Sequence, residues 1–153
     1  MKYLDTSAFV KHYRNKEEGS AAIHDLMQNT RDGKEQLISS FLVVGETVSV
    51  FDKWTRYKFI SSDECFKLVK IFLKDIKELS DDSAFILEPV SMSTITNCLE
   101  LITKHHLSLN DAIHLYTALG NKSLIDEFIC SDEMLLKAAK SDGFKVFNPE
   151  DNN

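Results

Sequence analysis

Short apolar runs that each end at a polar or turn residue recur along this chain, and longer segments of helical periodicity separate them. Five such runs lie at residues 2–4, 36–38, 85–87, 128–130 and 144–147. Each predicts a short strand bounded by turn signals. Strands that alternate with helices are typical of a largely parallel sheet with helices on its faces. The sequence therefore predicts an α/β fold with a mostly parallel sheet of about five strands.

Apolar residues at helical spacing predict the buried faces of the helices between these strands. The stripes are Phe41, Val44, Val48 and Phe51; Phe66, Val69, Leu73 and Ile76; Ile95, Leu99 and Ile102; and Ala112, Leu115 and Leu119. Four lysines, Lys67, Lys70, Lys74 and Lys77, each follow a member of the second stripe by one position. We interpret them as solvent-exposed helix charges rather than as a nucleic-acid-binding edge.

The length of 153 residues, with only 5 Gly and 2 Pro, predicts one domain over residues 1–150 and a short polar tail over 151–153. No apolar run approaches the roughly 18 residues that a membrane span requires. The first residues include Asp5 and form no apolar signal core, so we expect a cytoplasmic protein with no membrane partner. The three cysteines form no C-x-x-C pair, and we expect them to be reduced and mostly buried.

The formal net charge is -6, from 18 basic and 24 acidic residues. This balance argues against a domain that grips nucleic acid through its overall charge, because counterion release needs Lys and Arg at the contact. It leaves open a nucleic-acid enzyme whose acidic site is filled by cations and bordered by a local basic rim.

Four acids stand where chemistry is expected in such a fold. Asp5 closes the first predicted strand, and Glu46 is the only ionisable residue between positions 41 and 51. Asp111 lies at the start of a predicted helix, and Asp132 follows the fourth predicted strand. Functional groups of parallel sheets gather beyond the carboxyl ends of the strands, so we expect these carboxylates to share one cleft.

Each acid also has a structural explanation. Asp5 or Ser7 can cap the next helix, and Ser108 with Asp111 resembles a capping box. Ser131 can cap a helix that begins near residue 133, and Glu46 can lie on the solvent edge of its helix. Taken together, converging carboxylates repel one another unless cations neutralise them. Oxygen ligands of high charge suit Mg²⁺ or Mn²⁺, which can polarise a phosphodiester and activate water.

The segments LDTSAFVKHY, SSFLVVGETVSVF, LSLNDAIHLYTAL and FICSDEMLLKAAKSDGFKVFNP follow one another along nearly the whole chain. In these segments and their order the sequence resembles the PIN-domain nucleases, and among them the VapC-type toxins of prokaryotic type II toxin–antitoxin systems. The resemblance implies a three-layer α/β/α fold and a Mg²⁺-dependent endoribonuclease in which Mn²⁺ can substitute. It also implies RNA as substrate, a cognate antitoxin that blocks the groove beside the site, and a homodimer.

The resemblance carries the family acids onto Asp5, Glu46, Asp111 and Asp132, the family hydroxyl onto Ser7 and the small polar residue onto Ser131. On this basis Asp5 and Asp111 would ligate the metal directly, whereas Glu46 and Asp132 would act partly through bound water. Ser7 and Ser131 would hold the metal ligands in place without binding the metal themselves. Ser7 would do so through a hydrogen bond to a carboxylate or a phosphate oxygen. Water would be the nucleophile.

The roles of several other polar residues near these acids remain open. Lys11 and Arg14 are the candidates for binding a substrate phosphate, with ordinary helix-surface charge as the alternative. The histidines at 105, 106 and 114 show no H-E-x-x-H pattern, so a histidine-ligated metal has little support. Trp54 and Tyr57, among the bases at 53, 56 and 58, can stack on nucleotides, but packing against a neighbour is the favoured interpretation.

Two other functions compete with a nuclease. A protein of the same fold can bind protein or RNA without cutting, although four retained carboxylates argue against it. A phosphatase that uses Asp5 as nucleophile would want a second Asp where Ser7 stands.

Overall fold

The computed structural model describes residues 1–14 and 17–151. Its centre is a sheet of five parallel strands in the order β3-β2-β1-β4-β5. The strands are β1 (Lys2–Leu4), β2 (Leu37–Ser40), β3 (Phe85–Glu88), β4 (Glu127–Ile129) and β5 (Val146–Phe147). The predicted α/β fold with a parallel sheet is therefore confirmed. Asn152 and Asn153 of the predicted tail lie outside the described residues.

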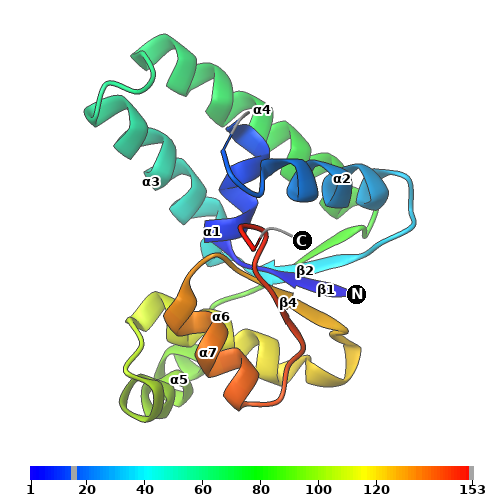
Figure 1. Ribbon diagram of the computed structural model, residues 1–153, viewed down its shortest axis with the longest axis vertical. Coiled ribbons are helices and arrows are strands. Elements are labelled where there is room, and N and C mark those ends of the chain that lie inside the picture. Colours follow the sequence, from blue (N-terminus) through cyan, green and yellow to red (C-terminus); the bar gives the residue numbers. More distant parts are fainter. Residues whose placement is uncertain (15–16, 152–153) are drawn as a thin grey trace.

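Helices cover both faces of the sheet (Figure 1). On one face lie α1 (Thr6–Phe9), a 3-10 turn (Val10–Tyr13), α2 (Ser20–Arg31), α3 (Leu42–Arg56) and α4 (Ser62–Asp81). On the other lie α5 (Met92–His105), α6 (Leu109–Gly120) and α7 (Glu133–Ser141), and a second 3-10 turn (Lys122–Leu124) follows α6. This arrangement confirms the three-layer α/β/α architecture.

Neighbouring strand residues send their side chains to opposite layers, as the pleat of a strand requires. Leu4 of β1 and Ile129 of β4 pack among α1–α4, whereas Tyr3 and Phe128 pack among α5–α7. The rings of Tyr3 and Phe128 stack with their centroids 4.8 Å apart. Fully burying an apolar side chain of this size contributes about 1.5–3 kcal/mol, so these short strands are held by both layers.

Only half of the predicted buried face of α4 is correct, since Ile76 is buried and Val69 packs half-buried against the core. Phe66 and Leu73 are 62% and 47% exposed, while the helix buries Phe72, Ile76 and Leu79. The sequence of α4 holds two overlapping apolar stripes at helical spacing, and the packing partner selects between them. The selected stripe sets the ring of Phe72 at 5.9 Å from that of Phe9.

The α5 stripe is shifted in a similar way, whereas the α6 stripe is largely correct. Leu99 of α5 is 50% exposed, and Cys98 and Leu101 are buried in its place. Ala112 and Leu115 of α6 are both fully buried. The reason is that α6 packs between the sheet and α5, so its apolar residues have protein on more than one side.

Two further expectations can be compared with the described chain. The three cysteines are free thiols; two of them are buried and the third is half-buried. Within residues 1–14 and 17–151, no helix has both the length and the apolar character that crossing a membrane requires.

The strand order determines where a site can form. The chain moves from β1 to β2 and β3 on one side, and β4 and β5 add to the other side of β1. At such a reversal the loops beyond the carboxyl ends diverge and leave a crevice. Asp5 follows β1 and Asp132 lies just beyond β4, so both residues stand at this crevice.

Candidate active site

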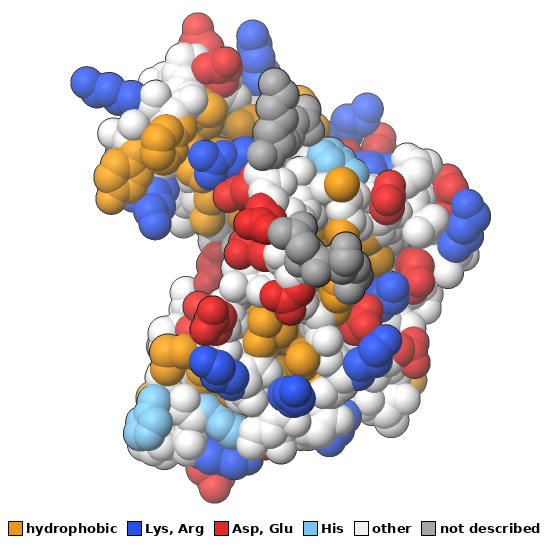
Figure 2. Space-filling model, in the orientation of Figure 1, with side chains coloured by type: hydrophobic (Ala, Val, Ile, Leu, Met, Phe, Trp, Pro, Cys, Tyr) orange, Lys and Arg blue, Asp and Glu red, His pale blue; other side chains and the backbone are white. Residues whose placement is uncertain are grey.

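The four predicted acids, Asp5, Glu46, Asp111 and Asp132, line one cavity of about 450 Å³ at the crevice. Asp5 comes from the start of α1, Glu46 from α3, Asp111 from the first turn of α6 and Asp132 from the start of α7. Figure 2 shows acidic side chains gathered in the notch between the two helical layers. The rest of the lining is Thr6, Ser7, Ser49, Val50, Lys53, Arg56 and Asn110.

Asp5 both caps a helix and faces the cavity. Its Oδ2 accepts hydrogen bonds from the backbone N of Ser7, at 2.9 Å, and from Ser7 Oγ, at 2.7 Å. Its Oδ1 lies 3.7 Å from His114 Nε2 and accepts no hydrogen bond from residues 1–14 or 17–151. Asp5 is only 4% exposed, so one fixed oxygen of a nearly buried carboxylate remains available.

Ser7 connects the two loops that flank the crevice. Ser7 Oγ donates to Asp5 and accepts a hydrogen bond from the backbone N of Ser131 at 2.9 Å. The Cys130 thiol beneath the site lies 3.5 Å from Asp5 Oδ2, and burial together with the Asp5 charge raises its pKa, so it stays protonated. Ser7 thus supports the Asp5 carboxylate on the side away from its free oxygen. Ser131 contacts Ser7 through its backbone N, and its own Oγ is buried and has no hydrogen-bond partner among the described residues.

Asp132, rather than the expected Ser131, caps α7. Its Oδ1 accepts a hydrogen bond from the backbone N of Leu135 at 2.9 Å. The backbone N of Asp132 donates to Cys130 Sγ at 3.2 Å, which turns the chain so that residue 132 reaches the cap position. Asp132 Oδ2 accepts no hydrogen bond within the described chain.

Asp111 is held by the capping interaction that the sequence predicts. Ser108 Oγ donates to Asp111 Oδ2 at 2.7 Å and accepts from the Asp111 backbone N at 3.2 Å. Burial raises the pKa of Asp111, and the charges of Asp5 and Asp132 raise it further against the opposing effect of Ser108. Burial is the larger cause of the raised pKa, and the contribution of Asp5 and Asp132 shows that the three carboxylates lie close enough to repel one another.

Glu46 is held more firmly than the sequence suggested. Its Oε2 accepts hydrogen bonds from Thr6 Oγ1 at 2.5 Å and from His114 Nε2 at 2.8 Å. Its Oε1 accepts from Asn110 Nδ2 at 2.9 Å. Burial would raise the pKa of Glu46, but these donors and the His114 charge outweigh burial and lower it. Glu46 is therefore an ionised and oriented group at neutral pH.

His114 contacts the acids of the cavity, a role that the sequence analysis did not predict for it. It is 1% exposed and lies between the carboxylates and the core. The backbone N of Ser40 donates to Tyr3 Oη at 3.2 Å, and Tyr3 Oη lies 2.8 Å from His114 Nδ1. Because an ionised carboxylate can only accept, Nε2–H is the donor to Glu46, whereas Nδ1 accepts from Tyr3 Oη in the neutral imidazole and donates to it in the charged one.

The charges around His114 also act on its protonation. Burial lowers the pKa of His114, but the nearby carboxylates of Asp5, Glu46 and Asp111 outweigh burial, so the pKa is raised. Asp111 and His114 are three residues apart on α6, which places both on one helix face. This spacing is the feature of the sequence from which a contact of His114 with the acids could have been predicted. Thr6 and Asn110, the two other missed contacts, each adjoin a predicted acid in the sequence.

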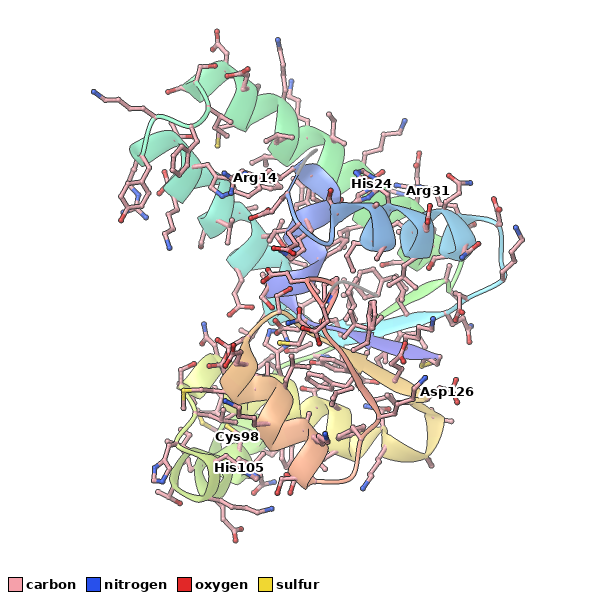
Figure 3. The ribbon with its side chains drawn as sticks, viewed as in Figure 1. Arg14, His24, Arg31, Cys98, His105 and Asp126 are labelled. Carbon is pink, nitrogen blue, oxygen red and sulfur yellow. The ribbon has the colours of Figure 1, made fainter. Side chains whose placement is uncertain are left out.

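The two predicted phosphate-binding residues lie outside the cavity. Lys11 is 2% exposed, and its Nζ is 2.5 Å from Glu150 Oε1. The Arg14 guanidinium stands 5.3 Å from the ring centre of Trp54 (Figure 3). Lys11 thus pairs with a carboxylate that is 40% exposed, and its contact with a substrate phosphate stays a prediction. The bases of the cavity are Lys53 and Arg56, both on α3.

The donor set of the cavity suits a hard cation that keeps part of its water. In residues 1–14 and 17–151, no three His, Cys, Asp or Glu side chains are placed to hold one ion together. The oxygens Asp5 Oδ1, Asp111 Oδ1 and Asp132 Oδ2 nevertheless accept no hydrogen bond from those residues. Mg²⁺ usually binds through one or two carboxylates, several waters and substrate phosphates rather than in an all-protein cage. The residues present therefore fit such an ion.

Comparison with known proteins defines the class of this chain. The family model of the PIN domain matches residues 2–141. The chain belongs to the PIN-domain family, whose members are generally nucleases. The crystal structure of PAE2754 from Pyrobaculum aerophilum matches with a TM-score of 0.58 and 17% sequence identity, over 98% of this chain and 90% of that one. This likeness supports the fold alone, and no curated protein matches the sequence.

Proposed function

We propose that this PIN-domain protein is an endoribonuclease that hydrolyses RNA phosphodiester bonds with Mg²⁺, or with Mn²⁺ in its place. The observation that carries the proposal is the meeting of four carboxylates, from four separate segments, in one cavity at the reversal of strand order. Such a cluster is stable in its ionised form only when cations neutralise it. A divalent ion accompanied by phosphate oxygens meets that need.

Asp5 and Asp111 would hold the ion directly, because each offers an oxygen that no described residue occupies. Asp132 would reach it directly or through water with its unoccupied Oδ2. Such an ion polarises a phosphodiester and lowers the pKa of water. Glu46 acts differently, since three protein donors already occupy it, and it orients a water through its remaining lone pair.

The surrounding side chains keep these acids in place before substrate arrives. Ser7 fixes Asp5 and fastens the loop after β4 at Ser131. His114 keeps Glu46 ionised and pointed into the cavity. Residues that orient metal ligands typically change metal affinity or activity by about 10- to 100-fold when removed.

The proposal is tested by RNA cleavage with Mg²⁺ or Mn²⁺ and the variants Asp5→Asn and Asp111→Asn. Each variant is expected to lose at least about 100-fold in rate. Asp126→Asn is the matched control, because Asp126 lies just before β4, at the end of the strands opposite the cavity (Figure 3). If the two site variants cleave as the parent does, a contaminant explains the activity and the assignment fails.

The proposed biological role is that of a VapC-type toxin, held inactive by a cognate antitoxin and forming a homodimer. Besides the resemblance of the sequence, large apolar side chains on α4 and α5 support protein partners: Phe66, Ile71 and Leu99 are each at least half exposed. Expression is expected to arrest growth, and Asp5→Ala or co-expression of a small neighbouring gene to relieve the arrest. Sedimentation equilibrium measures the dimer. Normal growth on expression of the active protein would contradict the toxin role.

The absence of a three-ligand cluster in the described residues favours a second candidate, a PIN-fold module that binds RNA or protein without cutting. Titration calorimetry with Mn²⁺ separates the two functions. A nuclease binds Mn²⁺ at or below about millimolar concentration and loses that binding in Asp5→Asn, whereas an inert module shows neither result.

A further inference from the structure

The face of α3 that carries Glu46 into the cavity continues outward with cationic and aromatic side chains. Lys53 and Arg56 line the same cavity as the four acids. Lys53 and Tyr57 follow Glu46 by about two and three helical turns, at 3.6 residues per turn. One line along the helix therefore leads from the acidic floor of the cavity to the outer end of α3.

The cations on this line have capacity to bind an anion. Lys53 is exposed, and no carboxylate of the described residues lies within ion-pair distance of it. Arg56 gives its Nε to Asp52 at 2.8 Å, which leaves its terminal nitrogens for another acceptor. Every other ionisable residue of the cavity lining is an acid, so Lys53 and Arg56 are the only basic side chains among the described lining residues.

Aromatic rings follow these cations at the end of the helix. Tyr57 is 62% exposed and Phe59 is 64% exposed, with their ring centroids 6.2 Å apart. Figure 2 shows hydrophobic and basic side chains side by side at this end of the molecule, beyond the acidic notch. Cations that track a backbone, combined with rings on which bases stack, are the components of a single-strand nucleic-acid surface.

We infer that Lys53, Arg56 and Tyr57, here called the α3 track, bind the RNA strand beside the bond that is cut; this inference rests on the proposed function. Lys53 and Arg56 bind backbone phosphates, and a base stacks on Tyr57. The local cations are needed because the chain carries a net charge of -6 and its cavity is acidic. Phosphate contacts fix register and orientation, so the track aligns the strand along α3 with its scissile phosphate at the acids.

A protein helix lying on the exposed rings is the rival occupant. Charge favours RNA, because the cations stand between the rings and the acidic cavity. A strand that reaches the acids from the outer end of α3 must pass Lys53, whereas a helix that covers only the rings need not touch it.

The test measures binding of a labelled, unstructured RNA of about 12 nucleotides to full-length protein in an Asp111→Asn background with Mg²⁺, by fluorescence anisotropy across a salt series. Lys53→Gln and Arg56→Gln are each expected to weaken binding and to reduce the slope of log affinity against log salt by about 0.7. Tyr57→Ala is expected to weaken binding by about 5- to 100-fold without changing the slope. Lys67→Gln, on the outer side of α4, removes the same charge and is expected to change neither quantity.

Equal effects of Lys53→Gln and Lys67→Gln would overturn the inference, because overall charge alone would then explain binding. Unchanged RNA binding in Tyr57→Ala, together with loss of a protein partner, would assign the rings to that partner instead. RNA cleavage assays separate a failure of the α3 track from a failure of the proposed function. If the parent cleaves RNA and the track variants bind and cleave equally well, only the track is wrong; if the parent neither binds nor cleaves RNA, the proposed function itself is wrong.

Discussion

Replacement of His114 by leucine cuts the chain of hydrogen bonds that joins the core to the acidic cavity. In the parent protein, His114 lies 2.8 Å from Tyr3 Oη on one side and 2.8 Å from Glu46 Oε2 on the other. Leucine is similar in size and apolar, so it fills the buried space without offering a donor or an acceptor. The cost should therefore come from the two lost hydrogen bonds rather than from a cavity.

The magnitude follows from what each partner loses. Tyr3 is fully buried, and a buried hydroxyl whose proton has no acceptor costs about 1–3 kcal/mol. Glu46 keeps two other donors and is 23% exposed, so its loss is about 1 kcal/mol. We expect His114→Leu to destabilise the fold by about 2–4 kcal/mol, which lowers the melting temperature by about 5–15 °C.

Urea unfolding of a double-mutant cycle measures this coupling. Tyr3→Phe alone should cost about 2–4 kcal/mol, because it leaves both His114 Nδ1 and the buried backbone N of Ser40 without their partner. The double variant should cost at least about 1 kcal/mol less than the sum of the two, since the Tyr3 hydroxyl and the His114 imidazole are then both absent and only the backbone N of Ser40 stays unpaired, as it does in Tyr3→Phe. A change below about 0.5 kcal/mol for His114→Leu, or additive costs in the cycle, would refute the proposed chain of hydrogen bonds.

Three further changes test other parts of the fold by urea unfolding. Glu150→Gln leaves the buried Lys11 cation without the charge of its half-exposed partner and should cost about 1–2 kcal/mol. A loss no larger than that of Glu133→Gln, which breaks the exposed pair of Glu133 with Lys137 on α7, would contradict this. Burial lowers the pKa of His12 to about 4. The unfolded chain therefore gains a proton near pH 6.5 that the folded chain takes up only near pH 4, and stability should fall by about 2 kcal/mol across that window. His12→Phe should flatten this slope, and an unchanged slope would count against it. Gly19→Ala, at a φ of +78°, places a Cβ 2.6 Å from the backbone carbonyl oxygen of Pro149 and should cost about 2–4 kcal/mol. Gly33→Ala, at a φ of +70° with nothing near its Cβ, should cost only about 1–2 kcal/mol. Equal costs for the two variants would mean that the steric contact is unimportant.

Most of the chain's architecture could be predicted from local pattern. Each of the five predicted strands overlaps an observed one, because short apolar runs ending at turn residues are a property of neighbouring residues. The four acids could be selected for the same reason: each stands beside a strand end, within a helix start or inside an otherwise apolar run. Their meeting in one cavity then follows from the parallel topology.

The errors in the predicted buried faces of the helices share one cause. Phe66 and Phe72 both fit an apolar stripe on α4, and only the partner surface decides which one is buried. The phosphate contact of Lys11 stays a prediction, and what the sequence did not indicate is its ion pair with Glu150, 139 positions further along the chain. Periodicity gives the angle at which a side chain leaves its own helix, and it does not say what occupies the space there.

The sequence by itself determined the alternation of strands and helices, the parallel sheet and the identity of the acids, because these depend on the order and spacing of side chains along the backbone. Only the tertiary structure decided how those acids are held. The hydrogen bond between Tyr3 and His114 joins residues 111 positions apart, and that between His114 and Glu46 joins residues 68 apart. Such contacts depend on how the layers close around the sheet, and no local pattern records a distance between segments that meet only after folding.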